Sequence, residues 1–307
     1  MRYLDPKADL TFKKVFGEHE DLVISLLNAL LPLRADEEVI EVEYLPAELV
    51  PDNPLRKNSI VDVRCVDAVG RQFIVEMQMV WSPEFLQRVL FNSAKAYVRQ
   101  LDKGFDYSLL KPVYSLNLVN DIFEPQLPEY YHYFKLVHEE HTEKVIDGLH
   151  LVFVELPKFT PHSMSEKKMQ VLWLRYLTEI KDGTEKIPQE LLDNAETGKA
   201  ISVLETSSYN DAQLASYDKF WDTISIEKTL YNSGERKGRE EGLMEGEAIG
   251  MEKGRAEGMA EGRAEEKRKI ASGMKQAGIP LETIAVITGL PLEEVKSISS
   301  LEIVNKN

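Results

Sequence analysis

Residues 60–78, "IVDVRCVDAVGRQFIVEMQ", combine two apolar segments with a short turn between them. Alternating apolar and polar residues on either side of a turn that contains Asp and Gly predict a β-hairpin. With residues 67–71 as the turn, the hairpin has one continuous apolar face, formed by the pairs Val61–Met77, Val63–Val75 and Cys65–Phe73. The same register places Asp62 directly opposite Glu76.

The two carboxylates need something to balance their charge. Like charges directly opposite each other on neighbouring strands are unfavourable, so an ionised Asp62–Glu76 pair requires a proton, a basic partner or a cation. Mg²⁺ takes oxygen ligands, usually one or two carboxylates together with waters and phosphate oxygens. The backbone carbonyl of Met77 is a candidate third ligand. The alternative is a solvated strand face on which Arg64 or Gln78 balances the charges.

A helix is predicted over residues 82–104, because Ser82 can cap it, Pro83 suits its first turn and Gly104 suits its end. At helical spacing one face carries Arg88, Asn92, Lys95 and Arg99. An apolar face is expected to cover the sheet with Leu86, Val89, Leu90, Ala94, Tyr97 and Leu101. The polar stripe suits a phosphate backbone, and the alternative is the solvated surface of an ordinary amphipathic helix.

Further elements on both sides of the hairpin complete an α/β pattern. Helical spacing predicts two short helices within residues 10–31, and alternation predicts strands at 39–45, 112–120 and 149–157. The order of helix, three strands, helix and strand favours a single α/β sheet.

The composition is that of a globular, acidic protein. The 307 residues are 43% hydrophobic and 29% charged, which suits about two domains. The single cysteine, Cys65, excludes an internal disulfide framework, and no apolar run approaches the ~20 residues of a membrane span. An N-terminus without a signal-peptide pattern predicts a cytoplasmic protein with no membrane partner. The formal net charge of −15 argues against a nucleic-acid partner unless a local basic stripe provides the contacts.

The C-terminal half is predicted to be helical throughout. A helical extension covers residues 161–233, glycine recurs at every fourth position within 234–268, and a tail of short helices covers 269–307. The abundant helix formers of the repeat favour a long helix, paired with a second copy as a homo-oligomer. The alternative is a linker, because each glycine costs up to ~1 kcal/mol of helix stability relative to alanine.

The tail has the rhythm of a helix-turn-helix, broken at Gly278 and Gly289. Its second helix presents Glu293 and Glu294 with only Lys296, and these side chains suit base edges poorly. The tail is therefore expected to contact protein or to cap an oligomer, and not to read DNA bases.

The acidic spacing, Asp62, thirteen residues, Glu76, one residue, Gln78, resembles the PD-(D/E)XK nuclease superfamily with glutamine in place of the usual lysine. Five segments in order look like the Rpn family of recombination-promoting nucleases and transposases: "DLTFKKVFG" at 9–17, "IVDVRC" at 60–65, "FIVEMQ" at 73–78, the helix with Arg88 and Tyr97, and "VELPKF" at 154–159. The resemblance covers residues 1–160 as the nuclease domain. It implies a restriction-endonuclease-like core, a mixed sheet flanked by helices, ahead of the helical C-terminal region.

The resemblance also implies metal-dependent hydrolysis of DNA in recombination or mobile-element processes. Asp62 and Glu76 would hold Mg²⁺, with Mn²⁺ or Ca²⁺ as substitutes, and Asp9 would match the acidic residue of the first helix. Directly before "LTFKKVF", Asp9 is equally a candidate N-cap. Gln78 would take the place of the lysine, and because an amide is not a useful base, water activation falls on the metal.

Five basic residues are candidate contacts to the DNA backbone: Lys13, Lys14, Arg88, Lys95 and Arg99. Arg88 is the candidate for stabilising charge on the non-bridging phosphate oxygens. For the two lysines of the first helix, the alternative is a role as ordinary surface charges.

Two other functions also agree with the sequence: a DNA-binding protein of the same fold that cleaves weakly, and a scaffold that assembles through its C-terminal helices.

Other chemistries fit the sequence poorly. Cys65 lacks the context of a nucleophile, and "HEEH" at 138–141 lacks the histidine spacing of zincins and predicts a solvated loop.

Overall fold

The computed structural model describes residues 2–49, 59–101, 104, 106–161 and 168–298. They form two compact units, one ending at Thr229 and the other beginning at Leu230. The long helix α7, Asp211–Gln276, begins in the first unit and continues into the second.

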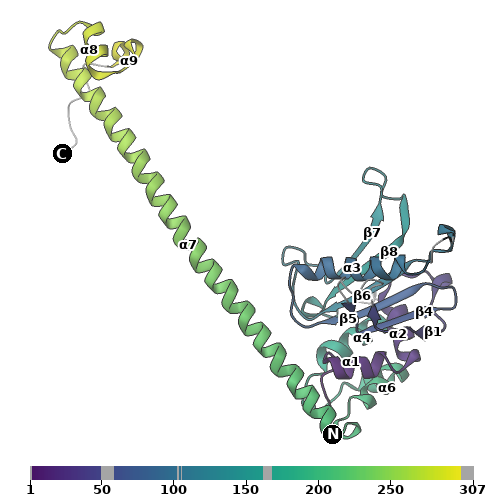
Figure 1. The fold of residues 1–307 in the computed structure, drawn as a ribbon. Coiled ribbons are helices and arrows are strands. Elements are labelled where there is room, and N and C mark those ends of the chain that lie inside the picture. The colour runs from purple at the N-terminus through teal and green to yellow at the C-terminus, as the bar shows by residue number, and fades with distance from the viewer. Residues whose placement is uncertain (1, 50–58, 102–103, 105, 162–167, 299–307) are drawn as a thin grey trace. The chain divides into compact units, whose positions relative to one another are not determined.

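A six-stranded mixed sheet is the centre of the first unit (Figure 1). Its strands lie in the order β1 (Val42–Tyr44), β4 (Val63–Asp67), β5 (Gln72–Gln78), β6 (Val113–Val119), β8 (Val145–Glu155) and β7 (Tyr131–Val137). The pairs β5–β6 and β6–β8 are parallel, and the pairs β1–β4, β4–β5 and β7–β8 are antiparallel. A separate ribbon pairs β2 (Glu48–Leu49) with β3 (Ser59–Ile60).

Helices cover both faces of this sheet, which confirms the predicted α/β class. One face shares a core with α1 (Asp9–Phe16), α2 (Glu20–Leu30), α4 (Lys168–Glu179) and α6 (Ala195–Val203). Cys65, Phe73 and Val75 are the strand residues at its centre. The helix α3 (Glu84–Val98) lies on the other face, with Ile74 and Val119, because side chains alternate between the two faces of a strand (Figure 1). The remaining short helices of this unit are α5 (Gln189–Asp193), η1 (Ala35–Glu37), η2 (Tyr107–Leu109), η3 (Leu156–Lys158) and η4 (Thr206–Ser208).

The inner part of the predicted hairpin register is confirmed. The ladder pairs Val63 with Val75, Arg64 with Ile74, Cys65 with Phe73 and Val66 with Gln72. Asp67 closes the turn, since its carboxylate accepts hydrogen bonds from the backbone N–H groups of Val69 and Arg71. Gly70 supplies the φ of +87° that the turn requires.

The open end of the hairpin differs from its prediction. The strand β4 begins only at Val63, so Asp62 lies just outside the ladder rather than directly opposite Glu76 within it. The backbone N–H of Val61 donates to the carbonyl of Ala47, 3.1 Å away, so that it bonds to the segment before β2 and not to β5. Asp62 therefore approaches β5 through its side chain.

The helix α3 is shorter than predicted, and it buries a different face. Pro83 rather than Ser82 occupies its N-cap position. Its buried residues are Phe85, Val89, Asn92, Ser93 and Ala96, whereas Leu90 is 49% exposed. Asn92, expected in the stripe that faces DNA, is only 2% exposed and faces the sheet, because the buried Glu76 carboxylate lies beneath it and binds its amide.

The strand β7 is the main element that the sequence patterns missed. It forms an antiparallel hairpin with β8, which itself begins at Val145 rather than near residue 149. The "HEEH" residues 138–141 lie in the connection between these strands and are exposed, as expected for a solvated loop.

The second unit consists of the continuation of α7, followed by α8 (Leu281–Thr288) and α9 (Leu292–Ser297). Gly278 and Gly289 adopt φ angles of +77° and +68° at the two predicted breaks. Ala271, Ile284 and Val295 form the small core that joins the three helices. The helix α7 runs through the glycine-rich residues 234–268. None of the helices in the described part of the chain has the length and apolar character that a membrane crossing needs.

Candidate active site

The acidic residues of the hairpin motif converge at one edge of the sheet. Glu76 and Gln78 lie at the carboxyl end of β5, Asp62 directly precedes β4, and Asp9 is the first residue of α1. Because β4 is antiparallel to β5, its beginning and the end of β5 share an edge. Lys13 Nζ joins α1 to this edge, 2.6 Å from Asp9 Oδ1 and 3.8 Å from Asp62 Oδ1.

Glu76 is the most deeply buried acid of the group. It is 6% exposed, and its Oε1 accepts a hydrogen bond of 3.2 Å from the side-chain amide of Asn92. Burial, followed by the negative charge of Asp62, raises the pKa of Glu76 to about 7, while Asn92 and Arg88 act in the opposite direction. The carboxyl is thus poised to gain or lose a proton, or to bind a cation, near neutral pH.

Asp62 is held in place by the strand that it faces. Its Oδ2 accepts a hydrogen bond of 2.8 Å from the backbone N–H of Met77, and its side chain is 24% exposed. Burial raises the pKa of Asp62 and the charge of Asp9 adds to that rise, whereas the Met77 N–H, Lys13 and Arg88 oppose it. The charge of Asp62 in turn raises the pKa of Glu76, as expected for two acids that share a site.

The structure excludes the N-cap role for Asp9. Ala8 occupies the N-cap position of α1, and Asp9 follows it within the first turn, where a negative charge is favourable. Asp9 pairs with Lys13 and contributes to the raised pKa of Asp62. It therefore belongs to the electrostatic surroundings of the two hairpin acids.

Gln78 positions Arg88 at the rim of the site. The Arg88 guanidinium donates to Gln78 Oε1, and one of its nitrogens lies 3.9 Å from Glu76 Oε2. The amide nitrogen of Gln78 donates to the carbonyl of Val80. Arg88 thus connects Gln78, the residue expected at the position of the motif lysine, with the buried Glu76.

The other basic candidates make contacts outside this group. Lys14 Nζ donates to the carbonyl of Ser208 and lies 4.0 Å from the ring centroid of Tyr209. Lys95 Nζ donates to the carbonyl of Leu49. Arg99 follows the last residue of α3. Burial, followed by the charge of Arg99, lowers the pKa of Arg64. The structure therefore brings together Asp9, Lys13, Asp62, Glu76, Gln78 and Arg88.

Two asparagines of the site received no such role from the sequence pattern. Asn92 binds Glu76 directly, and its own Oδ1 is buried without a hydrogen-bond partner in the described part of the structure. Asn117 is the β6 residue paired with Glu76, is fully buried, and donates to the carbonyl of Val152 at 3.0 Å. An amide side chain in the middle of a largely apolar strand is the signal that could have revealed Asn117.

The "VELPKF" segment stabilises the same edge of the sheet. The fully buried carboxylate of Glu155 binds the side chains of Lys158 and His132 and accepts from the backbone N–H of Glu124. Burial by itself raises the pKa of Glu155, but these hydrogen bonds, that from Lys158 first, outweigh it and lower the pKa. The segment therefore links the carboxyl end of β8 to β7 and to the loop that contains Glu124.

The donor set fits a magnesium-type cation. Within the described residues no group of three or more His, Cys, Asp or Glu side chains could hold a metal. Mg²⁺ needs only one or two carboxylates, because waters and substrate phosphate complete its octahedron. A divalent cation would favour the ionised forms of Asp62 and Glu76, whose pKa values are raised, and a water bound to it would give the buried Oδ1 of Asn92 a partner.

The match to a known family agrees with this geometry. The family model of the PD-(D/E)XK nuclease family transposases matches residues 6–225, which include the whole acidic edge and the helices that support it. No curated protein and no solved structure shows a significant match. Nucleases of this superfamily generally use divalent metal ions, and the family implies a DNA substrate. The chain belongs to the PD-(D/E)XK nuclease family transposases.

Proposed function

We propose that this protein is a cytoplasmic, magnesium-dependent endonuclease that hydrolyses DNA phosphodiester bonds during recombination or the movement of mobile elements. The Asp62–Glu76 pair is the observation that carries the proposal, since burial raises both pKa values and the charge of Asp62 raises that of Glu76 further. A divalent cation favours the ionised form of both acids and removes this conflict.

Asp62, Glu76 and the backbone carbonyl of Met77 are the proposed metal ligands. The N–H and C=O of one strand residue point to the same neighbouring strand. Since the Met77 N–H binds Asp62, its carbonyl is expected on the same side. When bound, a divalent cation supplies a more acidic water and positive charge for the phosphoryl oxygens, and Mn²⁺ is the expected substitute.

Arg88 and Lys13 are the cations best placed for the scissile phosphate. Gln78 holds the Arg88 guanidinium, so that a donor fork is available to non-bridging oxygens as charge develops on them. Lys13 lies between Asp9 and Asp62 and is available to a phosphate on the α1 side. Gln78 itself is proposed to position Arg88 and not to deprotonate the attacking water, because an amide is not a useful base.

Lys14, Lys95 and Arg99 are proposed as contacts to more distant phosphates. Lys14 and Lys95 already donate to backbone carbonyls, so their contribution to DNA affinity is expected to be smaller than that of Arg88. Asp9 is proposed to orient Lys13, from the 2.6 Å ion pair between them.

Self-assembly through α7 is a second proposed property. Residues 234–268 lie in a single helix with glycine at every fourth position, and their apolar side chains, among them Leu243, Met244 and Met251, are largely exposed. If α7 of a second copy packed against it, with the two backbones close together at the glycines, these side chains would be covered. A homo-oligomer is therefore the proposed state of the chain.

The decisive experiment is plasmid nicking by the full chain in Mg²⁺ and in EDTA. Asp62→Asn and Glu76→Gln are expected to abolish nicking while DNA binding in Ca²⁺ persists. Glu43→Gln, which removes an exposed acid on β1 of the same sheet, is the matched control and should nick normally. Binding without Mg²⁺-dependent nicking would instead support the weak-cleavage alternative, and absence of DNA binding would support the scaffold.

A further inference from the structure

A pocket lies beside the candidate active site, beyond the carboxyl ends of β6 and β8. Its volume is about 450 Å³, and its lining includes Lys7, Asn120, Phe159, Thr178, Lys181 and Trp221. In sheets with parallel strands, ligands commonly bind outside the carboxyl ends of those strands. The pocket occupies that position next to β5, whose carboxyl end carries Glu76 and Gln78.

Two connections place the pocket next to the hairpin acids. The backbone N–H of Asn120 donates to the carbonyl of Gln78 at 2.8 Å. Lys7 lies two residues before Asp9, at the entrance to α1. The pocket is therefore joined to the site through both β5 and α1.

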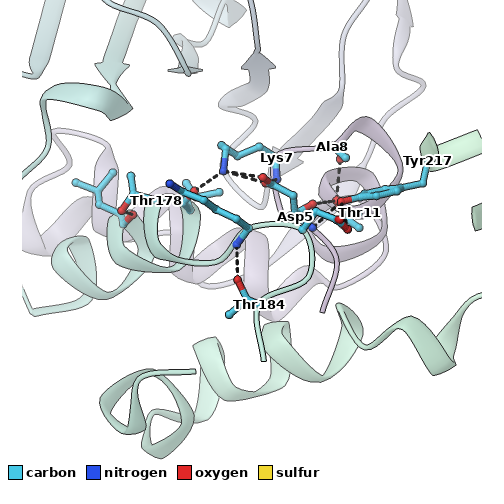
Figure 2. A network of polar contacts seen from close by, with 11 residues as sticks. Asp5, Lys7, Ala8, Thr11, Thr178, Thr184 and Tyr217 are labelled. Atoms are coloured by element: carbon cyan, nitrogen blue, oxygen red, sulfur yellow. Dashed lines mark hydrogen bonds and ion pairs between the residues drawn. The ribbon is translucent and has the colours of Figure 1, made fainter. Parts of the chain in front are cut away.

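One wall of the pocket is built from a buried ion pair. Lys7 Nζ lies 2.9 Å from Asp5 Oδ1 and donates to the carbonyl of Leu177 at 3.0 Å, as Figure 2 shows for the Asp5–Lys7 pair. The backbone of Asp5 is bound by Tyr217 and Thr11, so this wall ties α1 to α7 (Figure 2). Both charged residues are buried, and a pair that satisfies its own charges forms a rigid wall without net charge.

The remaining lining combines an aromatic ring with a basic group. Trp221 is partly exposed and Lys181 is exposed, whereas Phe159 is buried in the core. Aromatic rings beside cations are the usual means of binding single-stranded nucleic acid, because every base has a face that can stack. The volume lies within the range of small-ligand pockets. A base within an intact duplex reaches a pocket only after it has been unstacked.

We propose that this pocket binds one unpaired nucleotide next to the scissile phosphate, with its base against Trp221 and its phosphate beside Lys181. The inference rests on the proposed nuclease function and defines its substrate class. The protein then prefers DNA in which a single-stranded segment adjoins a duplex, since no base has to be extracted from the helix.

The test measures DNA binding by the full chain in Ca²⁺, by fluorescence anisotropy, with three probes. These are a blunt duplex, the same duplex with single-stranded overhangs of either polarity, and the overhang duplex with abasic nucleotides in the overhang. The overhang is expected to bind roughly ten times more tightly than the blunt end, and the abasic overhang to lose most of that advantage.

Three variants assign the effect to the pocket. Trp221→Leu should remove the overhang advantage, whereas Trp221→Phe keeps an aromatic ring and should retain most of it; thermal melting confirms that both fold. Lys181→Ala should weaken overhang binding several-fold. Lys144→Ala, an exposed lysine in the β7–β8 connection, is the matched control and should bind as the unaltered chain does.

The possible outcomes separate this inference from the function on which it rests. Equal binding of blunt and overhang duplexes overturns the pocket proposal and leaves the nuclease proposal standing. An overhang advantage that survives both Trp221→Leu and Lys181→Ala also overturns it. Failure to bind any of the three probes overturns the nuclease proposal itself.

Discussion

The Asp62 carboxylate accepts a hydrogen bond of 2.8 Å from the backbone N–H of Met77, the residue next to Glu76. A side-chain oxygen thus takes a bond that a backbone carbonyl would accept in a continuing ladder. The bond brings one acid to the strand that carries the other, where burial raises the pKa of both, although the bond itself opposes the rise for Asp62. Asp62 can bind Met77 in this way because the β4–β5 ladder ends at Val63.

The stability of the metal-free protein should depend on pH through Glu76. Its pKa rises from an ordinary 4.5 to about 7, because of burial first and then the charge of Asp62. The folded state holds the proton more tightly, so this contribution to stability is complete below pH 4.5 and is lost as the pH rises through about 7. The free energy of unfolding should fall by up to about 3 kcal/mol over that window.

Urea denaturation in EDTA at a series of pH values measures this slope. Glu76→Gln should flatten it, because an amide does not titrate, and Glu43→Gln should leave it unchanged. Added Mg²⁺ should restore stability above pH 7, since the cation binds the ionised acids. A slope of the opposite sign in the unaltered protein would contradict the assignment of Glu76.

Asn92→Ala should weaken metal binding without removing a ligand. Asn92 is the buried donor to Glu76, and the loss of a group that orients a metal ligand typically costs about 10- to 100-fold in metal affinity. Electron paramagnetic resonance of Mn²⁺ provides the affinity independently of cleavage. Ser93→Ala is the control, because Ser93 is also buried but donates to the carbonyl of Val89 in its own helix. Equal Mn²⁺ affinities of the two variants would exclude the positioning role.

Arg88→Ala should slow the chemical step more than it weakens DNA binding. The guanidinium is held by Gln78 close to Glu76, where the scissile phosphate is proposed to lie. Loss of one donor to developing charge typically costs about 10²–10³ in rate. Single-turnover nicking at saturating enzyme measures this step, and Arg34→Ala, at the exposed N-cap of η1, serves as the control. If the two variants cleave equally fast, Arg88 has no such role.

Glycine substitutions in α7 should separate helix stability from self-assembly. A Cβ on Gly250 meets no described atom within 4 Å, so Gly250→Ala should stabilise an unpaired helix by about 1 kcal/mol. Leucine at Gly246, Gly250 and Gly254 together should instead block a close helix–helix approach and convert an oligomer to a monomer. Light scattering of the full chain reports the mass, and circular dichroism reports helix melting. A monomeric mass for the unaltered chain would refute the assembly proposal.

Much of the fold follows from patterns that are local in the sequence. The alternation on either side of Asp67 and Gly70 defines the inner register, since a slip of one residue would turn every apolar side chain to the wrong face. Gly278 and Gly289 mark real helix ends, because glycine readily takes the positive φ found there. The spacing of Asp62, Glu76 and Gln78, taken together with three further segments in the right order, indicated the nuclease family to which the chain belongs.

What only the tertiary structure decided is how polar groups distant in the sequence satisfy one another. Asn92 turns toward the sheet because Glu76 is buried beneath it, and a buried charge must find a partner. Asp9 is no cap, and its charge instead acts on Asp62 and Lys13. Local periodicity identifies a polar face but not the group that will lie against it. The partner is chosen by burial, which exists only once the strands and helices have packed.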